Sequence, residues 1–194
     1  MIFKNKAIFL DRDGTINREV GYLSNINDIE IFPGVIEALS EFRNLGFKNI
    51  VVTNQSAIAR GLISEDQLTE IHNNFRYILT SEGKCLLDDI IFSPYHEDGV
   101  IEQYKTKSFL RKPNPGMILK AAFTHNLSLK NSFMIGDAFS DMLCAKYAGI
   151  KKVLVLSGYG RETQKKCKNE GLLIDFVTDN LKSASEIIKK YLEN

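Results

Sequence analysis

The stretch FLDRDGTIN, residues 9–17, decides the fold of this chain. It continues a short apolar run from Ala7 that is typical of a buried strand. The strand ends in two aspartates, Asp11 and Asp13, with Gly14 directly after them. Ligands of an open α/β sheet bind just beyond the carboxyl ends of its strands, so this acidic pair lies where chemistry is expected.

Two neighbouring carboxylates oppose each other's ionisation, and a bound cation would remove that conflict and supply an electrophile. Taken alone, the stretch also fits a solvated acidic turn or the metal-holding acidic pair of a sugar-nucleotide transferase. The remaining motifs therefore have to decide between these alternatives.

Composition limits the class of protein. The chain has 194 residues, 44% of them hydrophobic and 25% charged, with a formal net charge of +1. These values predict one globular domain over residues 1–194 and give no reason to expect binding to nucleic acid or to a membrane. The three cysteines, Cys85, Cys144 and Cys167, are far apart, which indicates reduced thiols in a cytoplasmic protein. We find no signal peptide and no apolar run of membrane-spanning length.

Short apolar runs alternate with amphipathic stretches of helical length, which predicts an α/β fold: a Rossmann-like, doubly wound parallel sheet with helices on both faces. After the first strand, strands are expected at residues 48–53, 86–92, 132–136, 152–156 and 175–178. Helices are expected at residues 34–45, 65–80, 115–124, 139–147, 162–169 and 183–192. Ser64 and Gln67 predict a capping box, and Asn114 is the expected N-cap of the helix at Pro115. The irregular stretches at residues 17–28 and 93–112 are small loop insertions, and we expect no separate cap domain.

Polar residues suited to phosphoryl transfer lie at four strand ends or helix starts. They are Asp11 and Asp13, then Thr53, then Lys112, and then Asp137 with Asp141. Each has an ordinary explanation alone, as a cap or a solvated charge, but their order across four strand–helix junctions is an improbable accident. Together they offer a nucleophile, donors for phosphoryl oxygens and charge neutralisation. Asp137 and Asp141 share one face if the helix begins at Asp137, and such oxygen ligands favour Mg²⁺.

The strings FLDRDGTIN, VVTNQS, RKPNPG and MIGDAFSD resemble, in order, the four motifs of haloacid dehalogenase-like phosphatases. They span residues 9–141, which is nearly the whole predicted core. The longer strings DRDGTIN, followed by GY, and TNQSAIARG resemble a narrower group, the D-glycero-D-manno-heptose 1,7-bisphosphate phosphatases and the related histidinol-phosphatases.

This resemblance implies a two-step hydrolysis through an aspartyl-phosphate. Asp11 is the implied nucleophile, and Asp13 the acid that protonates the leaving oxygen and later takes a proton from water. Thr53 and Lys112 match the groups that stabilise the phosphoryl oxygens. The implied Mg²⁺ ligands are the carboxylates of Asp11 and Asp137 and the backbone carbonyl of Asp13, with Asp141 close behind them.

The resemblance also implies a set of substrate contacts. Arg111 matches a residue of substrate recognition, and its planar fork could hold a second phosphate or a pair of sugar hydroxyls. The remaining contacts are expected from two segments: Glu19, Val20, Gly21 and Tyr22 in the first loop, and Asn54, Gln55 and Ser56 after the second strand.

Three departures from the group limit what can be carried over. Many relatives hold the long loop with a zinc ion on three cysteines and one histidine, whereas this loop has His96 and no cysteine. We therefore predict no structural zinc. The alternatives are that Tyr95, Phe109, Leu110 and their neighbours order the loop instead, or that the loop is mobile. Ala138 stands where close relatives often have lysine, and Ala57 replaces a glycine, which leaves the substrate and its anomer open.

The sequence thus predicts a Mg²⁺-dependent, monomeric, cytoplasmic phosphatase of a small phosphorylated sugar. The favoured reaction is removal of the 7-phosphate of heptose 1,7-bisphosphate, in the biosynthesis of nucleotide-activated heptose for lipopolysaccharide. Histidinol phosphate or another small monoester is the alternative substrate. Other classes are a phospho-accepting receiver domain, which is shorter and carries its acceptor aspartate on a middle strand, and a non-catalytic binding module.

Overall fold

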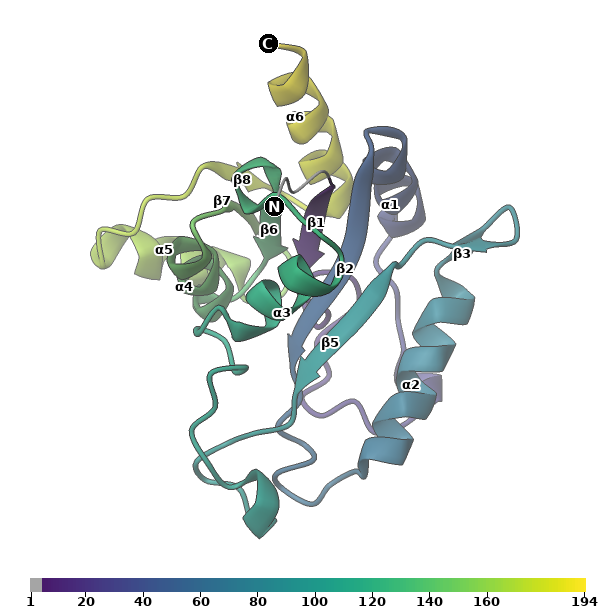
Figure 1. The fold of residues 1–194 in the computed structure, drawn as a ribbon, viewed down its shortest axis with the longest axis vertical. Coiled ribbons are helices and arrows are strands. Elements are labelled where there is room, and N and C mark those ends of the chain that lie inside the picture. Colours follow the sequence, from purple (N-terminus) through teal and green to yellow (C-terminus); the bar gives the residue numbers. More distant parts are fainter. Residues whose placement is uncertain (1–4) are drawn as a thin grey trace.

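The computed structural model describes residues 5–194. Its centre is a six-stranded sheet in the order β5-β2-β1-β6-β7-β8, in which every neighbouring pair is parallel (Figure 1). The strands are β1 (Lys6–Leu10), β2 (Phe47–Asn54), β5 (Asp89–Ser93), β6 (Phe133–Gly136), β7 (Lys151–Val155) and β8 (Phe176–Thr178). This arrangement confirms the predicted doubly wound parallel sheet.

Helices cover both faces of the sheet. They are α1 (Val35–Asn44), α2 (Glu65–Ile78), α3 (Gly116–Thr124), α4 (Phe139–Ala148), α5 (Gly160–Asn169) and α6 (Leu181–Glu193). The central strand β1 alternates between the two cores, because successive strand side chains point to opposite faces. Ile8 and Leu10 pack with apolar residues of α1, α2 and α6, whereas Ala7 and Phe9 pack with those of α3 and α4.

The third predicted strand begins later than expected. The short strands β3 (Thr80–Ser81) and β4 (Lys84–Cys85) form a separate antiparallel hairpin, and β5 starts only at Asp89. Asp88 therefore lies at the amino end of β5, away from the carboxyl ends of the strands. Its carboxylate pairs with Arg43 at 3.1 Å and with Lys48 at 3.3 Å.

Two predictions about helix starts have different outcomes. The capping box of α2 is confirmed: the Ser64 hydroxyl accepts from the Gln67 amide at 3.1 Å, and the Gln67 side chain accepts from the Ser64 amide at 2.8 Å. The prediction that Asn114 caps α3 is wrong. The side-chain amide of Asn114 instead donates to the carbonyl of Ser108 at 3.2 Å, and Pro115 takes the N-cap position.

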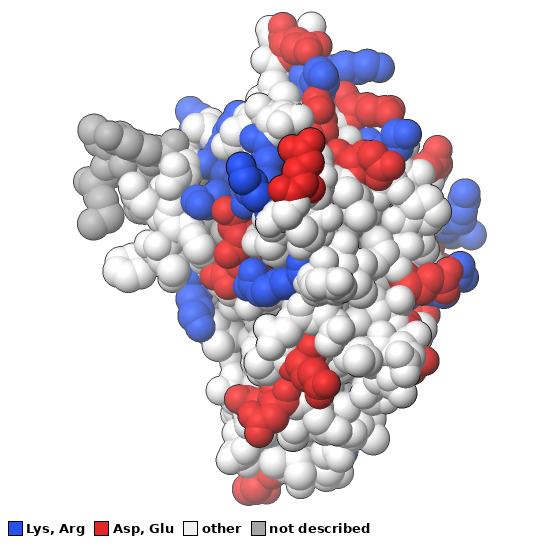
Figure 2. All heavy atoms as spheres, turned by 90° about the vertical axis from the view of Figure 1, so that its right-hand side faces the viewer, with Lys and Arg blue, Asp and Glu red and all other residues white. Residues whose placement is uncertain are grey.

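The long loop at residues 94–112 is mostly irregular, with one 3₁₀ turn, η2 (Glu102–Tyr104). The first loop contains the 3₁₀ turn η1 (Ile26–Asp28), and η3 (Leu129–Asn131) precedes β6. Within residues 5–194, no helix is long and apolar enough to cross a membrane. On the face shown in Figure 2, lysines and arginines lie among acidic residues and do not form a continuous basic area.

Candidate active site

The sheet brings the predicted motifs together at its switch point. From β1 the chain goes to β2 and β5 on one side, and then returns to β6, β7 and β8 on the other. Ligands of such sheets bind at the carboxyl ends of the strands where the order reverses. Asp11 follows β1 and Asp137 follows β6 at this point, with Thr53 on the adjacent β2 and Lys112 at the end of the long loop.

These side chains line one small cavity of about 120 Å³. Its lining consists of Asp11, Asp13, Glu19, Thr53, Asn54, Lys112, Asp137, Ala138, Ser140 and Tyr159. A second hollow of about 420 Å³ shares Lys112 with it and is otherwise lined by the long loop, including His96 and Arg111. The small cavity contains the reactive groups, and the larger one offers room beside them.

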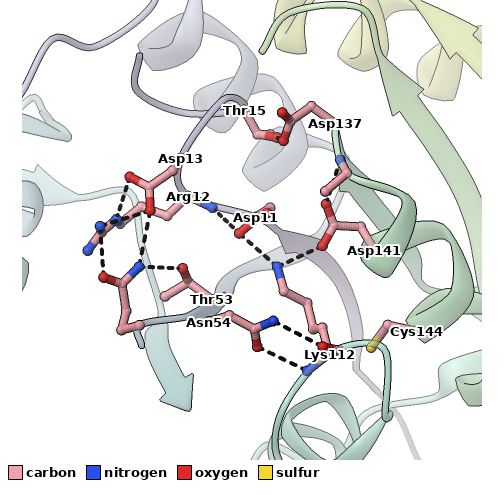
Figure 3. Close-up of polar contacts among 12 residues, drawn as sticks. Asp11, Arg12, Asp13, Thr15, Thr53, Asn54, Lys112, Asp137, Asp141 and Cys144 are labelled. Carbon is pink, nitrogen blue, oxygen red and sulfur yellow. Dashed lines mark hydrogen bonds and ion pairs between the residues drawn. The ribbon is translucent and has the colours of Figure 1, made fainter. Parts of the chain in front are cut away.

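Lys112 is the centre of the charged cluster (Figure 3). Its Nζ lies 2.7 Å from Oδ1 of Asp11 and 2.7 Å from Oδ1 of Asp141. The lysine side chain is only 2% exposed. Burial disfavours its charge, but the two carboxylates outweigh burial and hold the pKa of Lys112 above its usual range. The lysine is therefore a fixed cation beside Asp11.

Burial dominates the acid–base behaviour of the two carboxylates that flank the cavity. It raises the pKa of Asp11 to about 7, with Asp141 adding to the rise and Lys112 opposing it. Burial likewise raises the pKa of Asp137 to about 7, with the nearby Asp11 charge as the next cause. Without a further cation, the site thus holds more negative charge than it can easily accommodate near neutral pH.

Backbone and hydroxyl donors fix the Asp137 carboxylate. Tyr159 donates its amide to Oδ2 at 2.8 Å, and Thr15 donates its hydroxyl to Oδ1 at 3.3 Å. Gly14 and Gly158 both have positive φ and lie so close to this carboxylate that a Cβ on either would collide with it. Only glycine allows such an approach in these conformations.

The donor set fits a hard divalent cation. Asp11, Asp137 and Asp141 each offer a carboxylate oxygen within 4.8 Å of the others, and this is the only such group of three acidic, histidine or cysteine side chains in residues 5–194. All three are oxygen ligands, which suits Mg²⁺ better than zinc. One oxygen of Asp141 faces Lys112 and the other accepts from the Ala138 amide at 3.0 Å, so both of its oxygens have partners, as both oxygens of Asp137 do.

The structure corrects the expected link between Asp137 and Asp141. Helix α4 begins at Phe139 with Ala138 at the N-cap, so Asp137 precedes the helix and the two aspartates do not share a helical face. They are brought together because Asp141 folds back onto the helix start through its bond to the Ala138 amide.

Asp13 points away from this cluster, toward Arg12 (Figure 3). Its carboxylate accepts from Arg12 Nε at 3.1 Å, Arg12 Nη2 at 2.9 Å, Asn17 at 3.0 Å and Gln55 at 3.1 Å. Burial opposes the charge of Asp13, but Arg12 and these donors prevail and lower its pKa below the ordinary value. Asp13 is therefore held as an anion.

The end of β2 and the residue after it contribute polar side chains to this site. Thr53 is buried, and its hydroxyl oxygen accepts from Gln55 at 2.9 Å, which leaves the hydroxyl proton to donate elsewhere. Asn54 exchanges two bonds of 3.0 Å with the backbone of Lys112 and so positions that lysine. Gln55 is 5% exposed and bonds to Asp13 and Arg12. The substrate contacts predicted for Asn54, Gln55 and Ser56 stay predictions.

Of the outer residues predicted to contact substrate, Glu19 and Arg111 line the two hollows. Glu19 lines the small cavity, and its carboxylate accepts from the Gly21 amide at 2.6 Å. Val20 and Tyr22 are 43% and 46% exposed. Arg111 donates to the carbonyl of Tyr95 at 3.1 Å and lines the larger hollow.

Hydrogen bonds and aromatic packing connect the long loop to the rest of the fold. Tyr104 donates its hydroxyl to Glu65 at 2.8 Å, and its ring packs edge-on against Tyr95 with 6.1 Å between centroids. The amides of Val100 and Ile101 both donate to the carbonyl of Ala59, at 2.7 and 3.0 Å. Leu110 packs against the core beside α3, as predicted. Phe109 is 61% exposed, and its carbonyl accepts from the Gly116 amide at 3.1 Å at the start of α3.

Several contributors were missed from the sequence. The sequence assigns no role to Arg12, although it lies inside the first motif. Its neighbour His72, on α2, lies 60 positions away along the chain. Thr15 and Tyr159 hold Asp137, and Asn17 helps to hold Asp13. A lone buried histidine on an amphipathic helix carries no local signal of a functional neighbour, so only the fold could reveal His72.

Comparison with known proteins identifies the family of this chain. A family model described as HAD-hydrolase-like matches residues 109–184. The D-glycero-β-D-manno-heptose-1,7-bisphosphate 7-phosphatase of Photorhabdus laumondii is 42% identical over 185 residues, which cover 95% of this chain and 97% of that protein. The enzyme of the same name from Escherichia coli K12 is 38% identical, over 95% of this chain and 94% of its own. The α-anomer 7-phosphatase of Burkholderia mallei is 40% identical over 153 residues, 79% of this chain and 80% of its own.

A solved structure agrees with the sequence relatives. The D,D-heptose 1,7-bisphosphate phosphatase of B. bronchiseptica, complexed with magnesium and phosphate, superposes with a TM-score of 0.83. It is 28% identical and the match covers 96% of this chain and 99% of that one. The chain belongs to the haloacid dehalogenase-like hydrolases, in the family of the D-glycero-D-manno-heptose 1,7-bisphosphate 7-phosphatases.

Proposed function

We propose that this protein is a Mg²⁺-dependent phosphatase that removes the 7-phosphate of D-glycero-D-manno-heptose 1,7-bisphosphate. The observation that carries the proposal is the convergence of Asp11, Lys112 and Asp137 on one cavity at the switch point of the sheet. The substrate is proposed from the names of the relatives, which cover nearly the whole chain. A place in heptose synthesis for lipopolysaccharide is proposed from the family resemblance of the sequence.

Asp11 is proposed as the nucleophile. Its Oδ1 is held by Lys112 Nζ and by the Arg12 amide, both at 2.7 Å, so the carboxylate has a fixed orientation and its other oxygen is left for attack on phosphorus. Attack forms the bond between Asp11 and phosphorus and breaks the bond from phosphorus to the sugar oxygen. Lys112 and the Thr53 hydroxyl supply a charge and a donor for the phosphoryl oxygens.

Asp13 is proposed to move the protons. It gives a proton to the departing sugar oxygen, and then takes one from the water that splits the aspartyl-phosphate. Its four donors favour the ionised form, which suits the second step. The arrival of an anionic phosphate raises the pKa of a neighbouring carboxylate, which favours uptake of the proton needed for the first step.

Asp11 and Asp137, with the backbone carbonyl of Asp13, are the residues proposed to hold Mg²⁺, and Asp141 supports them. When bound, the cation supplies charge neutralisation for the phosphoryl oxygens and for the crowded carboxylates. Asp141 keeps Lys112 in place at 2.7 Å, and the glycines at 14 and 158 leave room for the Asp137 carboxylate.

Substrate selection is proposed to come from the mouth of the site. Glu19 and Asn54 line the small cavity, Arg111 lines the larger hollow, and Asn54 bonds to the backbone of Lys112. Tyr22 is proposed as a further contact from the loop that carries Glu19. We also expect a monomer in the cytoplasm, which gel filtration and cell fractionation would test. The absence of structural zinc stays a prediction.

A phosphate-release panel tests the function. Purified protein with Mg²⁺ is given both anomers of heptose 1,7-bisphosphate and histidinol phosphate. We expect many turnovers per enzyme molecule with one heptose anomer and a much lower kcat/KM for histidinol phosphate. A higher kcat/KM for histidinol phosphate would reassign the substrate. A single phosphorylation event without turnover would indicate a receiver, and no reaction at all a binding module.

A further inference from the structure

The Asp13 carboxylate depends on one guanidinium group. Arg12 supplies two of its four hydrogen bonds, from Nε at 3.1 Å and from Nη2 at 2.9 Å. This bidentate contact fixes both the position and the plane of the carboxylate. The position of the Asp13 carboxylate therefore depends on the contacts that hold the Arg12 side chain.

Arg12 is itself deeply buried, with its side chain 2% exposed. A buried guanidinium has five N–H groups that need acceptors, and unpaired ones are costly. Beyond Asp13, Nη2 donates to Gln55 Oε1 at 3.1 Å, and Nη1 lies 3.3 Å from His72 Nε2. Among residues 5–194, this imidazole nitrogen is the one acceptor within hydrogen-bonding distance of Nη1.

Helix α2 presents His72 and Phe75 together, because residues three apart lie on one helical face. The Phe75 ring lies under the guanidinium, with 5.4 Å between the guanidinium carbon and the ring centroid. His72 is 7% exposed and packs on Phe92, 5.6 Å between ring centroids. Both rings are thus buried, and together they fix the position of the Arg12 guanidinium.

The chemistry of the contact assigns the roles of its two partners. A guanidinium can only donate, so His72 Nε2 must accept, and the proton of the neutral ring lies on Nδ1. Burial, followed by the Arg12 charge, lowers the pKa of His72 to about 3, which agrees with a neutral ring.

We propose that His72 is a positioning residue for proton transfer: its Nε2 accepts from Arg12 and fixes the guanidinium that holds the Asp13 carboxylate. The inference rests on the proposed phosphatase activity, in which Asp13 protonates the leaving group. His72 does not touch the reacting atoms, so its effect must pass through Arg12.

The matched pair His72→Met and His72→Gln tests the acceptor. Both side chains have nearly the same length, but only glutamine carries a strong acceptor. The readout is kcat/KM for two esters: heptose 1,7-bisphosphate, whose sugar oxygen needs a proton to leave, and p-nitrophenyl phosphate, whose phenolate leaves without one. The parameter kcat/KM covers binding and the first chemical step only.

For His72→Met we expect kcat/KM to fall on the order of 10-fold with heptose bisphosphate and less than about threefold with the aryl ester, since general acid catalysis as a whole contributes roughly 10²- to 10⁴-fold. His72→Gln should recover most of the loss. His125→Gln, which alters a histidine bonded to Asp89 at 2.8 Å at the opposite end of the sheet, is the control and should match the wild type.

Equal losses with both esters, no loss with either, or no recovery in His72→Gln would overturn the positioning role while leaving the proposed function intact. No turnover of heptose bisphosphate by the wild-type protein would overturn both. A measurement on the wild type needs no variant to fold: ¹⁵N NMR of the imidazole should show the Nδ1–H tautomer at neutral pH, and an Nε2–H or protonated ring would contradict the proposal.

Discussion

Lys112 Nζ and Asp11 Oδ1 lie 2.7 Å apart, so the proposed nucleophile carries its counter-charge before any substrate arrives. The same ammonium also reaches Asp141, which connects the long loop to the start of α4. The Asn54 side chain holds the backbone of Lys112 from the other side. The orientation of Asp11 therefore depends on three segments that are distant in the sequence.

Replacement of this lysine should affect both activity and stability. In Lys112→Met, kcat/KM should fall on the order of 10²-fold or more, because a fixed charge on the phosphoryl oxygens is lost. The free energy of unfolding should fall by about 3 kcal/mol, since Asp141 is left buried without its partner. Lys107→Met is the control: this side chain is 83% exposed, and its loss should change stability by no more than about 0.5 kcal/mol. A Lys112→Met enzyme with the wild-type kcat/KM would disprove the role.

Asp13 should matter for proton transfer and little for binding. Asp13→Asn should lower kcat on the order of 10²-fold or more and change KM by only a few-fold, as measured by steady-state phosphate release. Asp98→Asn serves as the control, because this loop carboxylate is 82% exposed. If the Asp13 variant turned over at nearly the wild-type rate, the acid would have to be sought elsewhere.

The stability of the metal-free protein should depend on pH through Asp11 and Asp137. Their pKa values are about 7 in the fold and 3.8 ordinarily, so the folded state holds protons that the unfolded state releases. This contribution to stability is complete below about pH 4 and is lost as the pH rises to about 7.

Asp137→Asn should therefore raise the melting temperature of the metal-free protein at pH 8 by a few degrees and change it less at pH 5. Mg²⁺ should raise the melting temperature of the wild type at pH 8 and have little effect on the variant. Calorimetry in the presence of a chelator and then of Mg²⁺ measures both. A variant that is destabilised equally at the two pH values would contradict the assignment of crowded charge.

The long loop should keep its structure without zinc. Elemental analysis of protein expressed in zinc-supplemented medium should find well under one zinc per chain, and a zinc chelator should not change the rate of proteolysis in residues 94–112. Tyr104→Phe, which removes the bond to Glu65, should speed that proteolysis, whereas Tyr77→Phe, altering a ring that is 83% exposed, should not. One tightly bound zinc per chain would refute the prediction.

Most of the fold followed from local pattern. Buried strands separated by amphipathic helices specify a parallel sheet, and the motifs around Asp11, Thr53, Lys112 and Asp137 come after its strands. Where the prediction failed, a different local hydrogen bond had formed in place of the expected one. Asn114 has the chemistry of a cap but bonds to Ser108, and Asp141 folds back to the helix start so that Asp137 need not be helical.

The support around the reactive groups could not be predicted in the same way. Arg12, His72 and Gln55 come from three different segments, and only folding places them around Asp13. The motif predicts that Gln55 contacts substrate. In the fold, its buried side-chain amide donates to Thr53 and Asp13, a role that spacing along the chain does not encode.

The central claim is that Asp11 forms the covalent bond to phosphorus. The most direct measurement is acid quenching of the enzyme during turnover of heptose 1,7-bisphosphate with Mg²⁺, followed by mass spectrometry of the peptide that contains residue 11. We expect a phosphoryl group on Asp11 in the wild type, and neither that group nor turnover in Asp11→Asn. Phosphate on another residue, or sustained turnover by Asp11→Asn, would contradict the account.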